Sequence, residues 1–542
     1  MYGVPKDSLR VQNEAEYRPP LVTDVPEILC DTGSQKAIAR TRAFMRECKN
    51  DEGCSPSKSY LPNRVLDLGH PIRLYKTRNE QGRYVCLSHC WGTEHGLLKT
   101  TNDTLLSRKR GILESELPKT FLDAVIFTRR LRIRYLWIDS LCIIQDDDHD
   151  WQREASNMQS VYRHSYLTLA ASKSGGPGEG LFSIAPEEFK LRKIPFKSNR
   201  GIRNMVSVRH SITHLGSRDQ FPLLKRGWVF QERVLSGRVL HFGPQELMWE
   251  CMCYTSCECG NVGTWDADHE FNKFWFPGLF TESNTIPWQH MWYSIVENYT
   301  TLQLTFEKDI FPALSGIAQQ MMKVRNAKYL AGLWDDSLIE DLLWHRRREV
   351  RWGAAVGTPP CARPGVWRAP TWSWASVKGA VEFQYDERAE RAHRFTPHIA
   401  GFDVQIDHRS KDTTGQLKKA MLIVFGSLAS ARIRHDHGET MNGTDAPIAI
   451  EVNGKLVNRL KSFIDYDLWS ASENHITDGE TIHCLTVGTW QDPEKPYGEI
   501  YYLILRSCGT SDEDAFERVG LLVLSSAQDC FTDVVKRKIT II

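Results

Sequence analysis

Two apolar stretches of the sequence end abruptly in polar and aromatic side chains that are suited to binding a ligand. In the first stretch, residues 84–92, the polar end consists of Ser88, His89 and Trp91, and in the second stretch it is Asp139. Both stretches predict buried strands, and in open α/β sheets ligands bind beyond the carboxyl ends of the strands. Because polar groups are costly to bury without a use, a binding site at this edge is our first hypothesis.

Asp139 closes the second stretch, and Gln145 follows within reach of the same edge. As a functional residue, Asp139 would accept hydrogen bonds from ribose hydroxyl groups or orient a catalytic group. As a structural residue, it would bond backbone amides in the turn before Cys142, as aspartate side chains often do. The sequence leaves both interpretations open.

Glu154 has the residue type and the setting of a general acid or base. It lies three positions after Trp151, so both side chains project from one face of a predicted helix, which also carries Met158 and Tyr162. A partly apolar setting raises the pKa of a carboxyl group toward the range that is useful for proton transfer. The alternative is a structural carboxylate paired with an arginine such as Arg226, since structural ion pairs give the same pattern.

A third polar group surrounds Trp228 and contains Arg226, Gln231, Glu232 and Arg233. The planar fork of arginine matches phosphate or carboxylate, so Arg226 and Arg233 are the cations expected to hold a pyrophosphate ligand. Glu232 could instead be their internal partner, which would make the group a self-contained network of salt bridges.

Four cysteines lie within nine residues, at Cys251, Cys253, Cys257 and Cys259. Dense thiolates suit zinc, and residues two apart on a strand share a face, so a site with four sulfur ligands is geometrically feasible. However, two Cys-x-Cys pairs are not the usual Cys-x-x-Cys zinc pattern. Unligated reduced cysteines in a hairpin are the alternative.

The elements that must position these residues alternate between strand and helix. Apolar strands are predicted at 84–88, 135–138 and 166–171, and amphipathic helices at 117–131 and 151–162. This alternation predicts a parallel sheet with right-handed crossovers and flanking helices. The carboxyl edge of such a sheet would gather the polar ends of its strands.

Composition and charge argue against several other classes of protein. The chain has 542 residues, with 68 basic and 67 acidic side chains and a net charge of +1, which does not favour capture of nucleic acid. No apolar stretch reaches the roughly 18 residues that a membrane-spanning helix needs, and the polar N-terminus shows no secretory signal. Its 14 cysteines therefore predict reduced thiols and a cytoplasmic location.

Three segments of the chain resemble the motifs of the fungal heterokaryon incompatibility (HET) domain. They are Leu87-Ser-His-Cys-Trp-Gly92, Tyr135-Leu-Trp-Ile-Asp-Ser-Leu-Cys-Ile-Ile-Gln145 with the helix that carries Glu154, and Arg226-Gly-Trp-Val-Phe-Gln-Glu-Arg-Val-Leu-Ser236. His89 stands where the family often has tyrosine. The resemblance implies a part in fungal non-self recognition, in which such domains trigger growth arrest or programmed cell death. The HET domain is also considered similar in fold to the TIR domain, and some TIR domains cleave NAD with a helical glutamate near a tryptophan.

The resemblance leaves more than one function open. The first is a signalling or interaction module that works through a protein partner or through self-association. The second is an enzyme that cleaves NAD or a related nucleotide with Glu154 as its catalytic carboxylate, and the third is a domain recruited to fungal metabolite biosynthesis. In the expected order, residues 1–60 are a leader, 61–260 the TIR-like α/β HET domain, 261–380 its mostly helical extension and 381–542 a β-rich domain.

Overall fold

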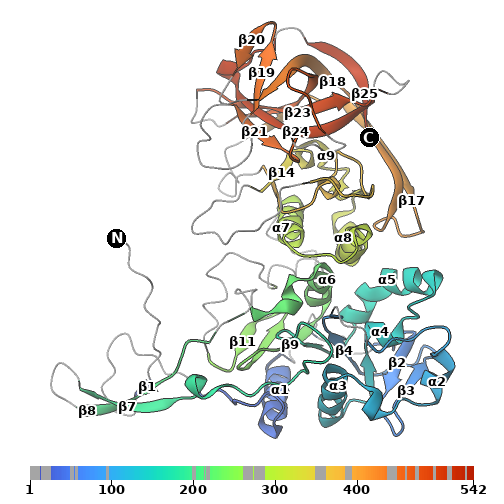
Figure 1. The fold of residues 1–542 in the computed structure, drawn as a ribbon, viewed down its shortest axis with the longest axis vertical. Coiled ribbons are helices and arrows are strands. Elements are labelled where there is room, and N and C mark those ends of the chain that lie inside the picture. Colours follow the sequence, from blue (N-terminus) through green and yellow to red (C-terminus); the bar gives the residue numbers. More distant parts are fainter. Residues whose placement is uncertain are drawn as a thin grey trace. The chain divides into compact units, whose positions relative to one another are not determined.

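The computed structural model shows a chain whose elements fall into two compact units (Figure 1). One unit comprises Met1–Ser283 and the other Asn284–Ile542. The structure describes residues 12–13, 26–48, 54, 59–92, 97–197, 203–212, 214, 220–260, 273, 287–347, 362–384, 394–435, 448–457, 460–469, 475–491, 496–509, 515–531 and 534–542.

The first unit is built on an eight-stranded sheet with the order β11-β10-β9-β6-β4-β5-β2-β3. The four central strands β5, β4, β6 and β9 are parallel, whereas the strands at both edges pair antiparallel. Its strands are β2 (Arg64–Asp67), β3 (Arg73–Lys76), β4 (Tyr84–Ser88), β5 (Tyr135–Trp137), β6 (Leu167–Ala170), β9 (Arg238–Phe242), β10 (Leu247–Cys251) and β11 (Thr255–Cys257). The predicted parallel sheet is therefore confirmed.

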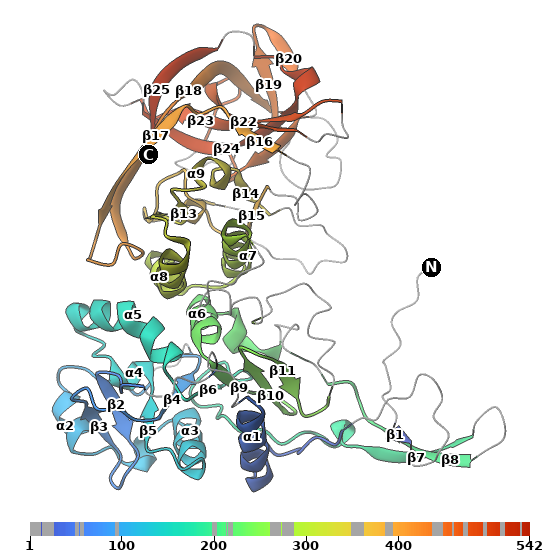
Figure 2. The same cartoon turned by 180° about the vertical axis from the view of Figure 1, so that it is seen from behind.

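Helices cover both faces of this sheet. They are α1 (Gln35–Glu47), α2 (Leu105–Arg110), α3 (Lys119–Arg130), α4 (Asp139–Cys142), α5 (Asp148–Arg163) and α6 (Gly227–Leu235). Figures 1 and 2 show α1 and α3 on one face of the sheet, and α5 and α6 on the other. The unit is thus a three-layer α/β structure.

The order of the parallel strands reverses beside β4. Along the chain, the parallel strands follow one another as β4, β5, β6 and β9. In the sheet, β4 lies between β5 and β6, and β9 lies beyond β6. The chain therefore winds away from β4 in one direction, through α3, and then in the other direction, through α5 and α6. Sheets wound in this way bind ligands where the strand order reverses, which here is beside β4.

Local sequence explains where α5 begins. The side chain of Asp147 accepts hydrogen bonds from the backbone N–H groups of His149 and Asp150 and so caps the helix. Asp148 and Asp150 lie in the first turn, where negative charge is favoured by the helix dipole. The predicted helix at 151–162 is confirmed, and it begins three residues earlier, at Asp148.

Helix α1 lies within the segment that the sequence predicts to be a leader. Ser34 caps the helix by accepting a hydrogen bond from the backbone N–H of Ala37, and Ile38 and Phe44 are buried. The Phe44 ring stacks on Trp249 of β10, with 5.5 Å between the ring centroids. This helix therefore contributes to the core of the unit. Three further strands, β1 (Gln12–Asn13), β7 (Arg192–Lys197) and β8 (Arg203–Val208), form a separate small sheet.

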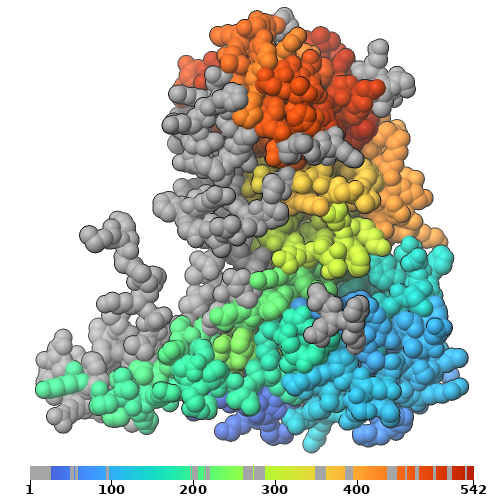
Figure 3. Space-filling model, viewed as in Figure 1, coloured from blue at the N-terminus to red at the C-terminus, as the bar shows by residue number. Residues whose placement is uncertain are grey.

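The second unit joins a helical part to a β-rich part. The helical part contains α7 (Trp288–Thr300), α8 (Pro312–Arg325) and α9 (Leu338–Asp341), with the short strands β12 (Tyr329–Leu330), β13 (Leu333–Trp334), β14 (Trp344–Arg346) and β15 (Val381–Phe383). The β-rich part is a ten-stranded sheet of β16 (Arg394–Pro397), β17 (Gly401–His408), β18 (Leu417–His435), β19 (Ile448–Val452), β20 (Lys455–Val457), β21 (Lys461–Ile464), β22 (Thr481–Gln491), β23 (Glu499–Ser507), β24 (Ala515–Ser525) and β25 (Val535–Ile541). Figure 3 shows this part in orange and red.

The ten-stranded sheet closes on itself. Strands β22, β23, β24, β25 and β18 pair in sequence, and β18 pairs again with β22. All of these pairs are antiparallel except β24 with β25. Ile433, Ile450, Ile504 and Leu522 belong to the buried core of this sheet. The predicted β-rich C-terminal region is therefore confirmed.

A buried arginine connects the two parts of the second unit. Arg518 of β24 donates to Asp465 at 3.1 Å and to the backbone carbonyls of Leu342 and Trp344 at 2.7 and 2.5 Å. Its guanidinium carbon lies 3.6 Å from the ring centroid of Trp344. The helical part thus packs with the β-rich part as one compact unit. Across both units, none of the described helices is long and apolar enough to cross a membrane.

Candidate functional site

Trp91 and Asp139 meet at the carboxyl edge of the parallel sheet. The indole Nε1 of Trp91 donates to Oδ2 of Asp139 at 2.8 Å. The other oxygen, Oδ1, accepts from the backbone N–H of Ser140 at 2.7 Å and lies 3.7 Å from Nδ1 of His89. Because β4 and β5 are neighbouring parallel strands, the residues that follow them lie side by side. Asp139 therefore both braces its own turn and contacts the residues that follow β4.

Glu232 places a buried carboxyl group beside Asp139. It lies on α6, and its Oε2 forms no hydrogen bond with any residue in the part of the chain that the structure describes. Burial, together with the negative charge of Asp139, raises the pKa of Glu232 to about 7. A carboxyl group with such a pKa exchanges its proton readily at neutral pH.

His89 is enclosed between the sheet and α3. Its ring contacts Phe121 edge to face, with 4.9 Å between the centroids. Burial lowers the pKa of His89 despite the opposing charge of Asp139, so the ring is neutral at neutral pH. Neither ring nitrogen, nor Oγ of Ser88, forms a hydrogen bond with another described residue. Buried polar atoms without a partner are uncommon, so these atoms are candidates for contact with a ligand.

Arg226 connects the start of α6 to the loop after β4. Its Nη1 donates to the backbone carbonyl of His89 at 2.8 Å, and its positive charge lowers the pKa values of Cys90 and Glu232 against the effect of burial. The residues that meet here are called the edge cluster: Ser88, His89, Trp91, Asp139, Tyr162, Arg226 and Glu232.

Gln145 supports the edge cluster from outside it. Its Nε2 donates to the backbone carbonyls of Asp139 and Ile143, both at 3.1 Å. These bonds fix the turn that follows β5. Gln145 therefore acts on the cluster by holding Asp139 in place.

Glu154 lies in a different set of contacts. It is 3% exposed, and its Oε1 accepts from Nδ2 of Asn63 at 2.9 Å and lies 3.5 Å from Arg64 and 3.4 Å from Arg153. Arg64 also forms a buried ion pair with Asp150. Within the described residues, the hydrogen bonds and ion pairs of Glu154 all go to these neighbours, and none joins it to the edge cluster. The arginine that pairs with Glu154 is Arg64 of β2.

The remaining residues of the third motif fasten α6 to its surroundings. Trp228 contacts Trp151 of α5 edge to face, with 6.3 Å between the centroids. Arg233 donates to both carboxylate oxygens of Glu250, at 2.7 and 2.5 Å. Gln231 is 1% exposed. Arg233 thus has a carboxylate partner on β10.

The four cysteines at 251–259 divide between two clusters, so the single four-sulfur site considered from the sequence does not form. Cys251 and Cys253 lie with Cys48 and Cys54, whereas Cys257 and Cys259 lie with His214 and Glu246; the ligand atoms of each cluster lie within 4.8 Å of one another. The hairpin register explains the division, because Cys257 pairs with Met248, three residues before Cys251. That offset is about 10 Å along a strand. Both clusters have ligand types and spacings that could hold a metal ion.

Several members of these groups are not predicted from the sequence. The missed residues are Cys48, Cys54, His214 and Glu246 at the thiol clusters, and Arg64 at Glu154. The pair Cys48 and Cys54 carries a signal, since these thiols are six positions apart in one short segment. Arg64, His214 and Glu246 carry none, because only the folded sheet brings them to their partners.

Comparison with known families gives a match, and its range includes the edge cluster. Residues 84–232 match the model of the family described as Heterokaryon incompatibility protein (HET). The matched range begins with the first residue of β4 and contains every member of the edge cluster. No curated protein and no solved structure matches the chain. Residues 84–232 of the N-terminal unit are therefore similar to the heterokaryon incompatibility (HET) domain.

Proposed function

We propose that the chain acts in fungal non-self recognition and that its HET domain is a signalling module that promotes growth arrest or cell death. The observation that carries this proposal is the match of residues 84–232 to the HET family, which implies a role related to heterokaryon incompatibility. The doubly wound order of its parallel strands is compatible with the TIR-like fold that the resemblance implies. In this role the domain would act by binding a protein partner or a second copy of itself.

The contacts of Glu154 support a signalling role over catalysis by that residue. Its carboxylate is shared among Asn63, Arg64 and Arg153, so it is engaged by the fold. A general acid or base must reach the proton that it transfers. Trp91 and Asp139 are likewise bonded to each other.

A second candidate function is hydrolysis of the glycosidic bond of NAD or a related nucleotide. The observation that favours it is the group of unpartnered polar atoms beside β4: Oγ of Ser88, both ring nitrogens of His89 and Oε2 of Glu232. They lie where doubly wound sheets bind nucleotides. In this alternative, Glu232, with its pKa of about 7, would be the proton donor to the leaving group. Glu154 would only hold α5 in place.

Inducible expression in a fungal host separates the two candidates. We expect wild-type protein and Glu232→Gln to arrest growth equally and to leave cellular NAD unchanged, because a signalling module needs the fold and its surface rather than one carboxyl group. Growth and NAD are measured in parallel cultures, with an empty vector as the control. Unimpaired growth of cells that express the wild-type protein would contradict a role in incompatibility. Loss of NAD that depends on Glu232 would instead establish the enzymatic alternative.

A further inference from the structure

The thiol cluster of Cys48, Cys54, Cys251 and Cys253 has the geometry of a metal site. Its four Sγ atoms lie within 4.8 Å of one another. Zinc bonded to four sulfurs at about 2.3 Å requires sulfur–sulfur distances of roughly 3.8 Å. The observed spread therefore needs only small side-chain rotations to enclose one ion. The Sγ atoms of Cys54 and Cys253 are separated by 2.9 Å, which is longer than the disulfide bond of about 2.05 Å.

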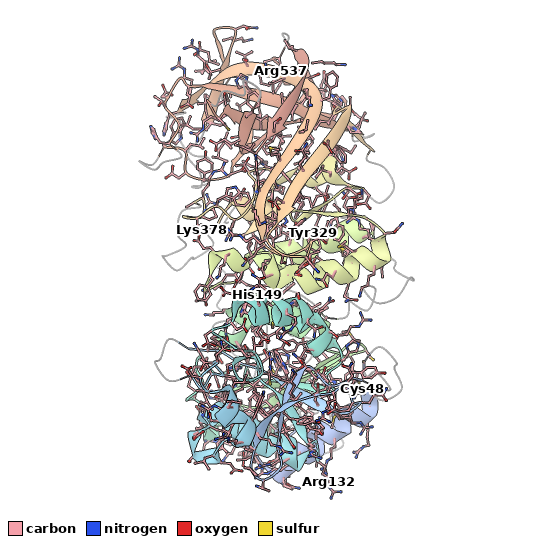
Figure 4. All side chains as sticks on the ribbon, turned by 90° about the vertical axis from the view of Figure 1, so that its right-hand side faces the viewer. Cys48, Arg132, His149, Tyr329, Lys378 and Arg537 are labelled. Carbon is pink, nitrogen blue, oxygen red and sulfur yellow. The ribbon has the colours of Figure 1, made fainter. Side chains whose placement is uncertain are left out.

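Two segments that are far apart in the sequence deliver these sulfurs. Cys48 caps the end of α1, where Figure 4 labels it. Cys54 follows six positions later, and Cys251 and Cys253 come from the end of β10 and the turn after it. Cys251 pairs with Arg238, the first residue of β9, so the thiol cluster lies at the amino edge of the parallel strands. The edge cluster lies at the opposite, carboxyl edge.

Two buried cations lie beside the thiol cluster. Arg238 is 2% exposed, and its Nε donates to Sγ of Cys48 at 3.4 Å. Within the described residues, this buried guanidinium forms no ion pair with a carboxylate. Lys273 is also fully buried, and its neighbours that favour the charged form are Glu250 first and then Cys251 and Cys54. A buried cation requires a nearby negative charge.

We propose that Cys48, Cys54, Cys251 and Cys253 form a structural zinc site that holds one Zn²⁺ ion through four thiolates. Binding replaces four S–H bonds by four Zn–S bonds and releases four protons to solvent, and neither zinc nor sulfur changes oxidation state. The resulting centre carries a net charge of −2, which Arg238 and Lys273 balance. Four protein ligands leave no open position for water, so the ion is structural. It fastens the end of α1 to the hairpin of β10 and β11.

Zinc analysis of the purified full-length protein tests this assignment. The protein is prepared under reducing conditions, incubated with excess Zn²⁺ and freed of unbound metal, and zinc per chain is measured by mass spectrometry. We expect Cys54→Ser and Cys253→Ser each to hold one zinc equivalent less than the wild type. Cys30→Ser is the matched control, because Cys30 is a half-buried cysteine of the same unit that belongs to neither cluster. Cys257→Ser, in the other cluster, should keep the equivalent that the two test variants lose.

A second measurement on the wild type keeps the test independent of how well the variants fold. Replacement of zinc by Co²⁺ should give the visible spectrum of a tetrahedral four-sulfur complex, and a strong chelator should abolish it and expose four additional thiols to alkylation. A wild type that binds no zinc would overturn the proposal. Zinc content that is the same in Cys54→Ser, Cys253→Ser and the wild type would also overturn it, as would a disulfide between any two of the four residues in the zinc-loaded protein.

Discussion

At the scale of single residues, Glu232 should make the stability of the protein depend on pH. Its pKa is about 7 in the folded chain, against 4.5 for an ordinary glutamate. Below about pH 4.5 the carboxyl group is protonated in both states, and between about pH 4.5 and about pH 7 the unfolded chain releases its proton first. Stability therefore falls as pH rises through this window and then levels off, at a total cost on the order of 3 kcal/mol.

Glu232→Gln should remove this cost, because the amide stays neutral at every pH. We expect the variant to equal the wild type near pH 4.5 and to exceed it by about 2 to 3 kcal/mol near pH 8. Urea unfolding at the two pH values measures the difference. Glu188→Gln, at an exposed position, is the control and should leave the pH dependence of the wild type intact. A Glu232→Gln variant with the same pH dependence as the wild type would show that the carboxyl group is already ionised in the folded chain.

The contact between residues that follow two neighbouring parallel strands was predictable from the sequence. The ion pair between a strand and a distant helix was not. Trp91 and Asp139 each end an apolar run, and parallel pairing forces such ends together. By contrast, Glu154 pairs with Arg64, which lies 90 positions earlier in the sequence, on β2, the strand next to the edge strand β3. No periodicity links these two residues. The two side chains pair because the completed sheet buries both of them, and the sequence alone does not show which residues it buries.

At the scale of elements, the ion pairs around Arg64 should hold α5 against the sheet. Arg64 is 6% exposed and neutralises Asp150 and Glu154 of α5. Arg64→Ala leaves both carboxylates buried without this partner, and we expect the unfolding free energy to fall by about 3 to 5 kcal/mol. Arg153→Ala is the matched control, because Arg153 contacts the same two carboxylates but its side chain is 59% exposed. Its loss should cost less than about 1 kcal/mol. Equal losses in chemical denaturation would contradict this account.

Elements were predicted best where the pattern is local. The strands before the edge cluster and the helices α3 and α5 follow from apolar runs and helical periodicity. Helix α1 was not expected, because its segment has weak periodicity, and the residues that bury it come from distant β10. The thiol clusters were misjudged for a related reason. The sequence shows that four cysteines are close together, but the hairpin register decides which of them share a face.

At the scale of the whole molecule, the helical segment after residue 283 belongs to the same compact unit as the β-rich sheet. Arg518 is central to this arrangement, since it is fully buried and bonds Asp465 and two carbonyls of the helical part. We expect Arg518→Met to lower the unfolding free energy of this unit by about 3 to 5 kcal/mol, because Asp465 stays buried without its partner.

Denaturation of the full chain, followed by circular dichroism of its β-structure, measures this loss. Arg434→Met is the control, because Arg434 is only half-buried in its ion pairs with Glu451 and Asp478, and the loss of these pairs should leave the transition close to that of the wild type. A wild-type transition in Arg518→Met would mean that the buried pair makes no net contribution to this unit.

The separation of Cys54 from Cys253 along the chain, 199 positions, bears on the order of events during synthesis. When α1 leaves the ribosome, the hairpin that completes its surroundings has not yet been translated. Until β10 and β11 emerge, Cys48 and Cys54 therefore lack their partner cysteines, and the face of α1 that packs on β10 stays uncovered. The free-energy cost of closing a loop grows only slowly with its length, by about 0.6 kcal/mol for each doubling. The separation thus delays maturation of the N-terminal unit until its last strands are made, without weakening the finished fold.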